Sequence, residues 1–276
     1  NKFNLQTMTE KTLTQLLITV LLFFATLFAL QQVDWISLFK VEQITDKTEE
    51  KLGDLLWESF KASNTENKDV FLTKSLDSIV TRISDANEFD KDFFKVHVLN
   101  SDEVNAFALP NGHLVIYSGL IADIEHQDEL VGVIGHEMAH IQMQHVMKKL
   151  IKEIGFSVLI SITTGSAGGE IVKQAAKTLS SSAFDRSLEK EADIKSVDYL
   201  TNANVNPAPF ADFLYRLSLA DSQLPSIVSW ISTHPDSKER AAYIIEYSKD
   251  KKTDFMPILS EKTWKKIQEN LSFNVE

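Results

Sequence analysis

Apolar residues recur every three or four positions along most of the chain, which is the spacing of amphipathic helices. In the run "VFLTKSLDSIVTRIS", one helical face carries Leu72, Leu76, Ile79, Val80 and Ile83. Residues 52–62 follow the same pattern, and helical spacing returns from about Asp128 and continues towards the C-terminus. The pattern therefore predicts a mainly helical domain.

The spacing of apolar residues changes between residues 93 and 121. The segments "FFKVHVLNS", "VNAFALP" and "HLVIYSGLI" are short and rich in β-branched and aromatic residues. Turn signals such as Pro110-Asn111-Gly112 separate them. These features predict three strands of a small sheet. The expected fold class is α+β, with a small sheet packed against many helices.

The N-terminal region contains the uncharged run "LTQLLITVLLFFATLFAL", residues 13–30. Because a helix rises about 1.5 Å per residue, roughly 20 apolar residues cross the hydrocarbon core of a bilayer. We interpret residues 13–32 as an uncleaved transmembrane anchor. A cleaved signal peptide is the first alternative, although its apolar core is shorter and ends at a small-x-small site that is missing here. A buried core helix is the second alternative.

This interpretation gives the order of segments along the chain. We expect a tail (residues 1–12), the anchor (13–32), a linker (33–50), a main domain (51–250) and a C-terminal helical extension (251–276). Lys2 and Lys11 precede the span, which favours a single-pass protein with its main domain outside the cytoplasm, on the periplasmic side. The apolar stretch Ile154–Gly169 is short for a span, so we expect a buried or interfacial segment or a mobile lid.

Charge and composition narrow the classes of function. The 276 residues include 28 basic and 39 acidic side chains, for a net charge of −11, which argues against a nucleic-acid partner. The chain has no cysteine, which excludes disulfides, thiolate nucleophiles and cysteine-ligated zinc.

The segment "VIGHEMAHIQMQH" (residues 133–145) holds three of the seven histidines. His136 and His140 are four residues apart, so on a helix their rings can direct nitrogens at one zinc ion. Glu137 points away from that pair and can reach a water on the metal without binding the metal. His145 has the wrong spacing for the same face, and we interpret it as a structural or surface residue. A hydrogen-bonded pair of core histidines is the alternative to a zinc site.

A tetrahedral catalytic zinc needs a third protein ligand. The segment "RSLEKEADIKSVDYL" offers Glu189 as that ligand, and Asp193, one turn later, can accept the outer N–H of a ligating histidine. Glu191 lies on another face and is the weaker choice. Without a neighbouring histidine pair, this acidic helix would be interpreted as an exposed charged face.

Four blocks in order resemble the family of membrane-linked zinc endopeptidases that includes HtpX, BepA and the CAAX prenyl protease. They are "NAFALPNGHLVIYSGLI", "ELVGVIGHEMAHIQMQH", "RSLEKEAD" and "STHPDSKER". The resemblance runs from about Val70 to Ile245. It implies a zincin-like metallopeptidase domain for residues 51–250, with one zinc ion per chain. HtpX and the prenyl protease have several spanning helices, whereas this chain has one candidate.

The resemblance also assigns roles to residues. It implies that His136, His140 and Glu189 bind zinc, that Glu137 is the general base, and that Asp193 supports the ligands. It places His234 and Arg240 in the lining of the active site, and we expect His234 to stabilise the oxyanion. Zinc peptidases of this kind hold substrate as an added strand, so the expected substrate-binding edge strand is Asn105, Ala106, Phe107 and Ala108. An interior strand is the alternative for that segment.

The function expected from the sequence is a membrane-anchored zinc metalloendopeptidase that cleaves protein or peptide substrates, including misfolded or membrane-associated ones. Two alternatives remain. One is a chaperone-like or binding module with a structural or latent zinc site, which the presence of Glu137 disfavours. The other is a prenyl-protein protease, which a single span disfavours.

Overall fold

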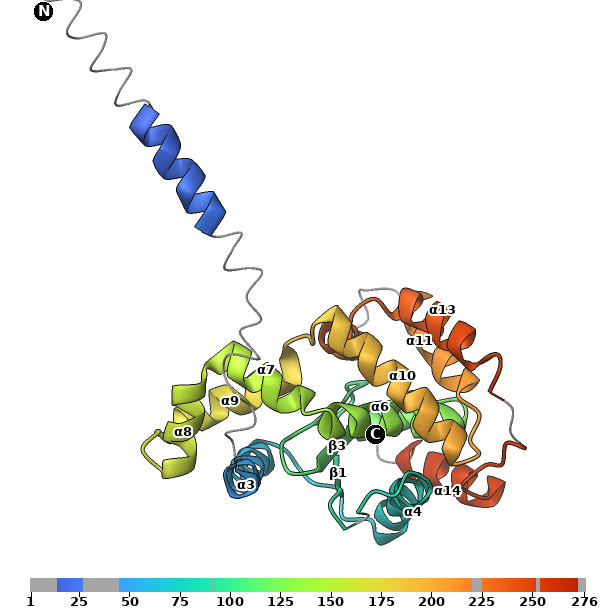
Figure 1. Ribbon diagram of the computed structural model, residues 1–276. Coiled ribbons are helices and arrows are strands. Elements are labelled where there is room, and N and C mark those ends of the chain that lie inside the picture. The colour runs from blue at the N-terminus through green and yellow to red at the C-terminus, as the bar shows by residue number, and fades with distance from the viewer. Residues whose placement is uncertain (1–13, 27–44, 91, 220–224, 252–253, 273–276) are drawn as a thin grey trace, which may run out of the picture. The chain divides into compact units, whose positions relative to one another are not determined.

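The computed structural model describes residues 14–26, 45–90, 92–219, 225–251 and 254–272 (Figure 1). The chain divides into two compact units, residues 1–41 and 42–276. In the first unit, residues 14–26 form a helix with exposed side chains. The other residues of the expected anchor, 13 and 27–32, lie outside the described part. Within the described residues, no helix combines the length and the apolar character that crossing a membrane requires.

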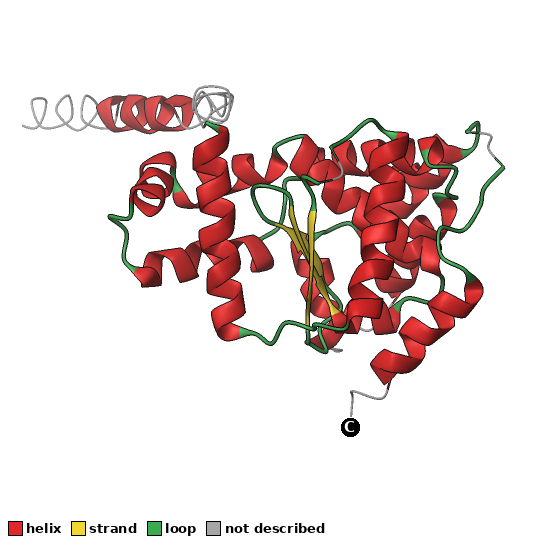
Figure 2. Ribbon diagram, turned by 90° about the horizontal axis from the view of Figure 1, so that it is seen from below, coloured by secondary structure: helices red, strands yellow, loops and turns green. Residues whose placement is uncertain are grey.

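The second unit contains a sheet of three strands, β1 (Lys95–Leu99), β2 (Ala106–Ala108) and β3 (His113–Tyr117), in the order β1-β3-β2. β1 runs parallel to β3, and β2 pairs antiparallel with β3, with Phe107 opposite Val115. In Figure 2 the strands run between helices that lie to either side of them. Three short strands in this region are what the sequence predicts.

Helices make up most of the described part of the second unit, which confirms the expected α+β class. They are α3 (Asp46–Ser63), α4 (Val70–Ala86), α5 (Ser118–Asp123), α6 (Gln127–Gln142), α7 (His145–Ile154), α8 (Phe156–Thr164), α9 (Gly169–Ser181), α10 (Arg186–Asn202), α11 (Ala208–Leu219), α12 (Pro225–Thr233), α13 (Ser237–Ser248) and α14 (Glu261–Ser272).

Two boundaries differ from the sequence prediction. α3 begins at Asp46, inside the segment expected to be a linker, because the Thr45 hydroxyl accepts a hydrogen bond from the Thr48 amide and caps the helix. The third predicted strand ends at Tyr117, and the chain turns directly into α5. The remaining proposed domain limits stay predictions.

α6 is the central helix of the domain, and residues 127–141 are all buried. It packs against α10 and α11, and glycines permit the close approach. A Cβ atom at Gly132 would lie 2.3 Å from Cβ of Phe210, and one at Gly135 would lie 2.6 Å from Leu200. The glycines of "ELVGVIG" therefore let neighbouring helices come close to the segment that carries the histidine pair.

The apolar stretch Ile154–Gly169 forms α8 and the turns on either side of it. α8 packs between α7 and α3, with Leu159 and Ile162 buried and Ile160 exposed. Figure 1 shows α7, α8 and α9 gathered at one end of the domain, away from α11 and α13. The lid and the membrane contact expected for this stretch stay predictions.

Candidate metal centre

Four buried side chains from three parts of the chain converge at one point. His136 and His140 come from α6, Glu189 from α10, and His234 follows α12. One potential ligand atom from each lies within 4.8 Å of the others. Nε2 of His136 lies 3.0 Å from Nε2 of His140, which in turn lies 3.2 Å from Oε1 of Glu189. The three ligands expected from the sequence are thus brought together.

These separations fit a metal ion. Ligand atoms at about 2.1 Å from a tetrahedral zinc lie roughly 3.4 Å from one another, and Nε2 of His136 lies 3.5 Å from Oε2 of Glu189. Two imidazole nitrogens that face each other at 3.0 Å need a shared cation or proton. All three side chains are at most 2% exposed. The set of nitrogen and oxygen donors suits zinc.

Asp193 stands behind His136, as the sequence predicts. Its Oδ1 lies 2.9 Å from Nδ1 of His136, which directs the other ring nitrogen towards the cluster. Arg240 holds Asp193 with two hydrogen bonds of 2.8 Å, and Tyr243 donates a third. Burial alone would raise the pKa of Asp193, but Arg240 and His136 bring that pKa to about 2. Asp193 is therefore an anion that keeps His136 in place.

Arg240 is buried, and its Nη2 lies 3.4 Å from Nε2 of His136, beside the proposed metal ligands. Besides Asp193, it contacts Glu189, with Nη1 2.6 Å from Oε2. Although burial opposes ionisation of Glu189, Arg240 is the first of the charges that hold its pKa well below the ordinary value. Arg240 thus contacts His136, Glu189 and Asp193 and balances the charge of the two acidic residues.

Glu137 is buried with neither carboxylate oxygen hydrogen-bonded. Burial raises its pKa to about 7 from an ordinary 4.5. Buried polar groups normally have partners, and an unpartnered carboxylate beside metal ligands is typical of a functional group that meets substrate or water. This is the position expected of a general base.

His234 lies closer to the ligands than the sequence suggested. Its Nδ1 is 3.1 Å from Oε1 of Glu189, and its Nε2 is 3.4 Å from Oε1 of Glu137. Burial lowers the pKa of His234 to about 4, against the pull of Glu189, so the ring is neutral near pH 7. Trp230 stacks on it, with ring centroids 4.3 Å apart. The ring can therefore either approach the metal or donate a hydrogen bond beside it.

His145 was expected to be structural or at the surface, and it is buried beside the cluster. Its Nδ1 lies 3.1 Å from Nδ1 of His140, and its Nε2 lies 3.2 Å from Oε2 of Glu191. His145 is not one of the four clustered side chains, but it lies near them because α6 ends at Gln142. Gln144, in a left-handed conformation with φ 56, turns the chain so that His145 begins a new helix. In the sequence, the grouping of three histidines within residues 133–145 is the feature that indicates a position near the site for His145.

The segment expected to bind substrate, Asn105–Ala108, consists of Asn105 and strand β2. β2 pairs with β3 alone among the described strands, so its other side is an edge of the sheet. Asn105 donates to the Ser229 hydroxyl, and its Oδ1 is buried without a partner. The four residues Asn105–Ala108 are at most 2% exposed. A substrate strand at this edge therefore requires a movement of what covers it.

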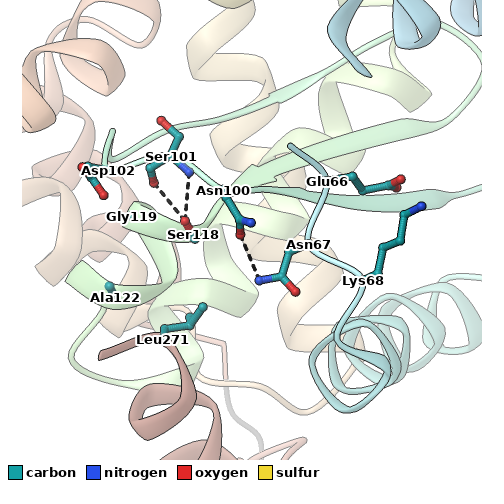
Figure 3. A pocket seen from close by; sticks show the side chains of 10 residues that line it. All are labelled: Glu66, Asn67, Lys68, Asn100, Ser101, Asp102, Ser118, Gly119, Ala122 and Leu271. Carbon is teal, nitrogen blue, oxygen red and sulfur yellow. Dashed lines mark hydrogen bonds between the residues drawn. The ribbon is translucent and has the colours of Figure 1, made fainter. Parts of the chain in front are cut away.

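Two cavities differ in their relation to the cluster. One of about 250 Å³ borders it through Glu189 and Arg240. Another, of about 560 Å³, lies where β1 and β3 end (Figure 3). Within it Asn67 donates to Asn100 at 3.0 Å and Ser118 bonds to Ser101, and none of its lining residues belongs to the cluster. The larger cavity is therefore not the reaction site.

Comparison with known proteins gives the family. Residues 72–248 match peptidase family M48. The chain belongs to peptidase family M48. The match includes the four clustered side chains, and it confirms the family expected from the four sequence blocks. Because enzymes of family M48 use zinc and the cluster suits it, the expected cofactor is confirmed as well.

Several proteins that are similar to this chain are named proteases. The mitochondrial metalloendopeptidase OMA1 of Bos taurus is 30% identical over 163 residues, which cover 54% of this chain and 31% of that protein. The metalloprotease LoiP of Escherichia coli K12 is 34% identical over 158 residues, which cover 55% of this chain and 60% of LoiP.

The beta-barrel assembly-enhancing protease of Escherichia coli K12 is 26% identical over 214 residues, which cover 70% of this chain and 42% of that protein. The matches thus span between 31% and 60% of the lengths of these three relatives. All three carry names of proteolytic enzymes, in agreement with the expected class of enzyme.

Proposed function

We propose that this protein is a zinc-dependent endopeptidase that hydrolyses peptide bonds in protein substrates. The observation that carries the proposal is Glu137, a buried carboxylate without a hydrogen-bond partner beside a set of metal ligands. A purely structural metal site needs no such group, so the chaperone-like alternative is not favoured. Membership in family M48 supports the same reaction class.

In this proposal His136, His140 and Glu189 hold zinc, and Asp193 and Arg240 keep the ligands oriented. When bound, the ion supplies Lewis-acid polarisation and makes water acidic enough to lose a proton near neutral pH. Glu137 accepts that proton and passes it to the leaving amine. Glu137 is the candidate for both transfers because it is buried next to His136 and neither of its oxygens has a hydrogen-bond partner.

His234 is proposed as the donor that stabilises the developing oxyanion. For this role the single N–H of neutral His234 must be on Nε2, which lies 3.4 Å from Oε1 of Glu137, and Nδ1, which lies 3.1 Å from Oε1 of Glu189, must be bare. The alternative position, with His234 as a fourth metal ligand, would close the open coordination site that hydrolysis needs. The catalytic state therefore uses His234 as a donor.

The edge strand Asn105–Ala108 is proposed to bind the substrate backbone as an added strand. Two observations support this: β2 pairs with β3 alone among the described strands, and Oδ1 of Asn105 has no hydrogen-bond partner. A further part of the proposal is that residues 13–32 anchor the protein in a membrane, with the domain on the periplasmic side and misfolded or membrane-associated proteins as substrates. The uncharged run at residues 13–30 supports the anchor.

The test compares wild-type protein with Glu137→Gln. We expect both to bind one zinc ion per chain, and only the wild type to cleave an unfolded protein such as casein in a chelator-sensitive way. Equal cleavage by both proteins would remove Glu137 as the base, and zinc binding without any wild-type cleavage would favour the alternative. Carbonate extraction and protease accessibility of membranes from producing cells test the anchor separately.

A further inference from the structure

His145 links the metal ligand His140 to a carboxylate at the surface. Its two ring nitrogens each face one partner, with His140 Nδ1 at 3.1 Å on one side and Glu191 Oε2 at 3.2 Å on the other. His145 is fully buried, whereas the Glu191 side chain is 49% exposed. The three side chains form a line that runs from the metal cluster to solvent.

The hydrogen-bond partners determine which ring nitrogen carries the proton in His140 and in His145. His140 must keep Nε2 free of a proton to bind a metal, so its proton sits on Nδ1. That N–H can only donate to Nδ1 of His145, which must then be bare. The proton of neutral His145 is consequently on Nε2, where it meets Glu191. A carboxylate accepts hydrogen bonds. Glu191 therefore favours the tautomer of His145 that carries its proton on Nε2 over the tautomer that carries it on Nδ1.

The two histidine ligands are thus held in different ways. His136 has a carboxylate directly at its outer nitrogen, because Oδ1 of Asp193 lies 2.9 Å away. His140 has none, and His145 transmits the influence of Glu191 to it. The turn at Gln144 brings His145 into place, and α10 supplies Glu191 two residues after the ligand Glu189.

We propose that His145 and Glu191 are positioning residues that fix the tautomer of His140 and so raise the affinity of the site for zinc. This inference rests on the proposed function, since it takes His140 as a zinc ligand. It adds to that function two residues that the reaction itself does not use. Residues that orient metal ligands typically change metal affinity by about 10- to 100-fold when replaced.

The first measurement is zinc affinity by competition with a chromophoric chelator at pH 7.5. We expect Glu191→Gln to weaken zinc binding by about 10- to 100-fold, because an amide can donate to His145 as well as accept from it. Glu50→Gln, which removes an exposed glutamate on α3, serves as the control and should leave the affinity unchanged. Circular dichroism of each metal-free variant checks the fold.

A second pair of variants separates a relay from two independent effects. His145→Phe removes the acceptor and should weaken zinc binding as much as Glu191→Gln does. His145→Asp places an acceptor-only oxygen near the former Nδ1, so it should restore most of the affinity. In that background Glu191→Gln should no longer weaken binding, because Glu191 acts only through His145. Equal losses from Glu191→Gln in both backgrounds would overturn the proposal.

Nitrogen-15 spectra of the wild type with labelled histidine test it without substitution. In the zinc-loaded protein His145 should carry its proton on Nε2, and a proton on Nδ1 would overturn the relay. The two hypotheses fail differently. If the wild type binds no zinc, the proposed function fails and the relay with it. If wild type and Glu191→Gln bind zinc equally well, only the relay fails.

Discussion

Arg240 and Asp193 form a buried bidentate ion pair, in which Nε and Nη2 of the guanidinium each lie 2.8 Å from a carboxylate oxygen. Both side chains are at most 2% exposed. Burying charges is costly, and the cost is offset only while the pair is complete. Because Nη1 also contacts Glu189, one cation balances both the proposed metal ligand Glu189 and Asp193, which contacts the ligand His136.

Replacing Arg240 by Met should therefore destabilise the metal-free protein strongly. Removing one partner of a buried ion pair typically costs about 3–5 kcal/mol. Urea unfolding at pH 7.5 measures this loss. The control is Arg186→Met, because Arg186 is 80% exposed and pairs with Asp236 at the surface, where about 0–1 kcal/mol is expected. Similar losses for the two variants would contradict the account of Arg240.

Glu137 should make the metal-free protein less stable as the pH rises. Burial raises its folded pKa to about 7 from 4.5, so folding favours the protonated form. The protein loses stability as the pH rises from 4.5 through 7, because a bare carboxylate must then be buried. At about 1.4 kcal/mol per pH unit between the two pKa values, the loss amounts to about 3 kcal/mol.

Glu137→Gln cannot ionise, so its stability relative to wild type should increase between pH 5 and 7.5 and level off above that. Unfolding free energies in the presence of a chelator, at pH values from 5 to 8.5, provide the measurement. Glu170→Gln, at an exposed position of α9, is the matched control. A difference between Glu137→Gln and wild type that does not change with pH would show that Glu137 does not titrate in this range.

Some parts of the site could be predicted from the sequence because they depend on spacing within one helix. His136 and His140 lie one turn apart on α6, and Glu189 and Asp193 lie one turn apart on α10. The relation of His145 to the site could not be predicted, because it depends on a left-handed turn at Gln144 that no glycine marks.

Contacts between distant segments are a second kind of feature that the pattern does not contain. Arg240 was expected in the lining of the active site, and its contact with Asp193 depends on the packing of α13 against α10. The small sheet was predicted from its β-branched runs. Its strand order, which leaves β2 at an edge, came only from the structure.

His234→Phe tests the oxyanion role. Phenylalanine can keep the stacking on Trp230 but donates no hydrogen bond. We expect kcat for cleavage of an unfolded protein to fall by about 10²- to 10³-fold, the usual effect of losing one oxyanion donor. The zinc content should stay at one ion per chain, as measured by atomic emission. A large drop in zinc affinity would instead show that His234 is a ligand in the resting protein.

Lys149 is a buried ammonium group close to the metal ligands. Its Nζ donates to the carbonyl of Leu179 at 3.0 Å and lies 4.1 Å from the ring centroid of Phe184. Phe184 in turn stacks on His140, with centroids 3.9 Å apart. Burial lowers the pKa of Lys149 to about 8 from 10.5. The charged form therefore destabilises the folded protein below pH 8, and the cost is relieved as the pH rises towards 10.5.

Lys149→Met should consequently gain stability relative to wild type at pH 6.5 and lose that advantage progressively above pH 8. The electrostatic part amounts to about 3 kcal/mol below pH 8, from which the lost hydrogen bond to Leu179 subtracts about 1 kcal/mol. Unfolding free energies at pH 6.5, 8 and 9.5 measure the trend, with Lys173→Met on the exposed side of α9 as the control. If Lys149→Met is instead destabilised at pH 6.5 and does not change with pH, the ammonium group stabilises the fold through its contacts with Leu179 and Phe184. Those contacts would then outweigh the cost of burying its charge.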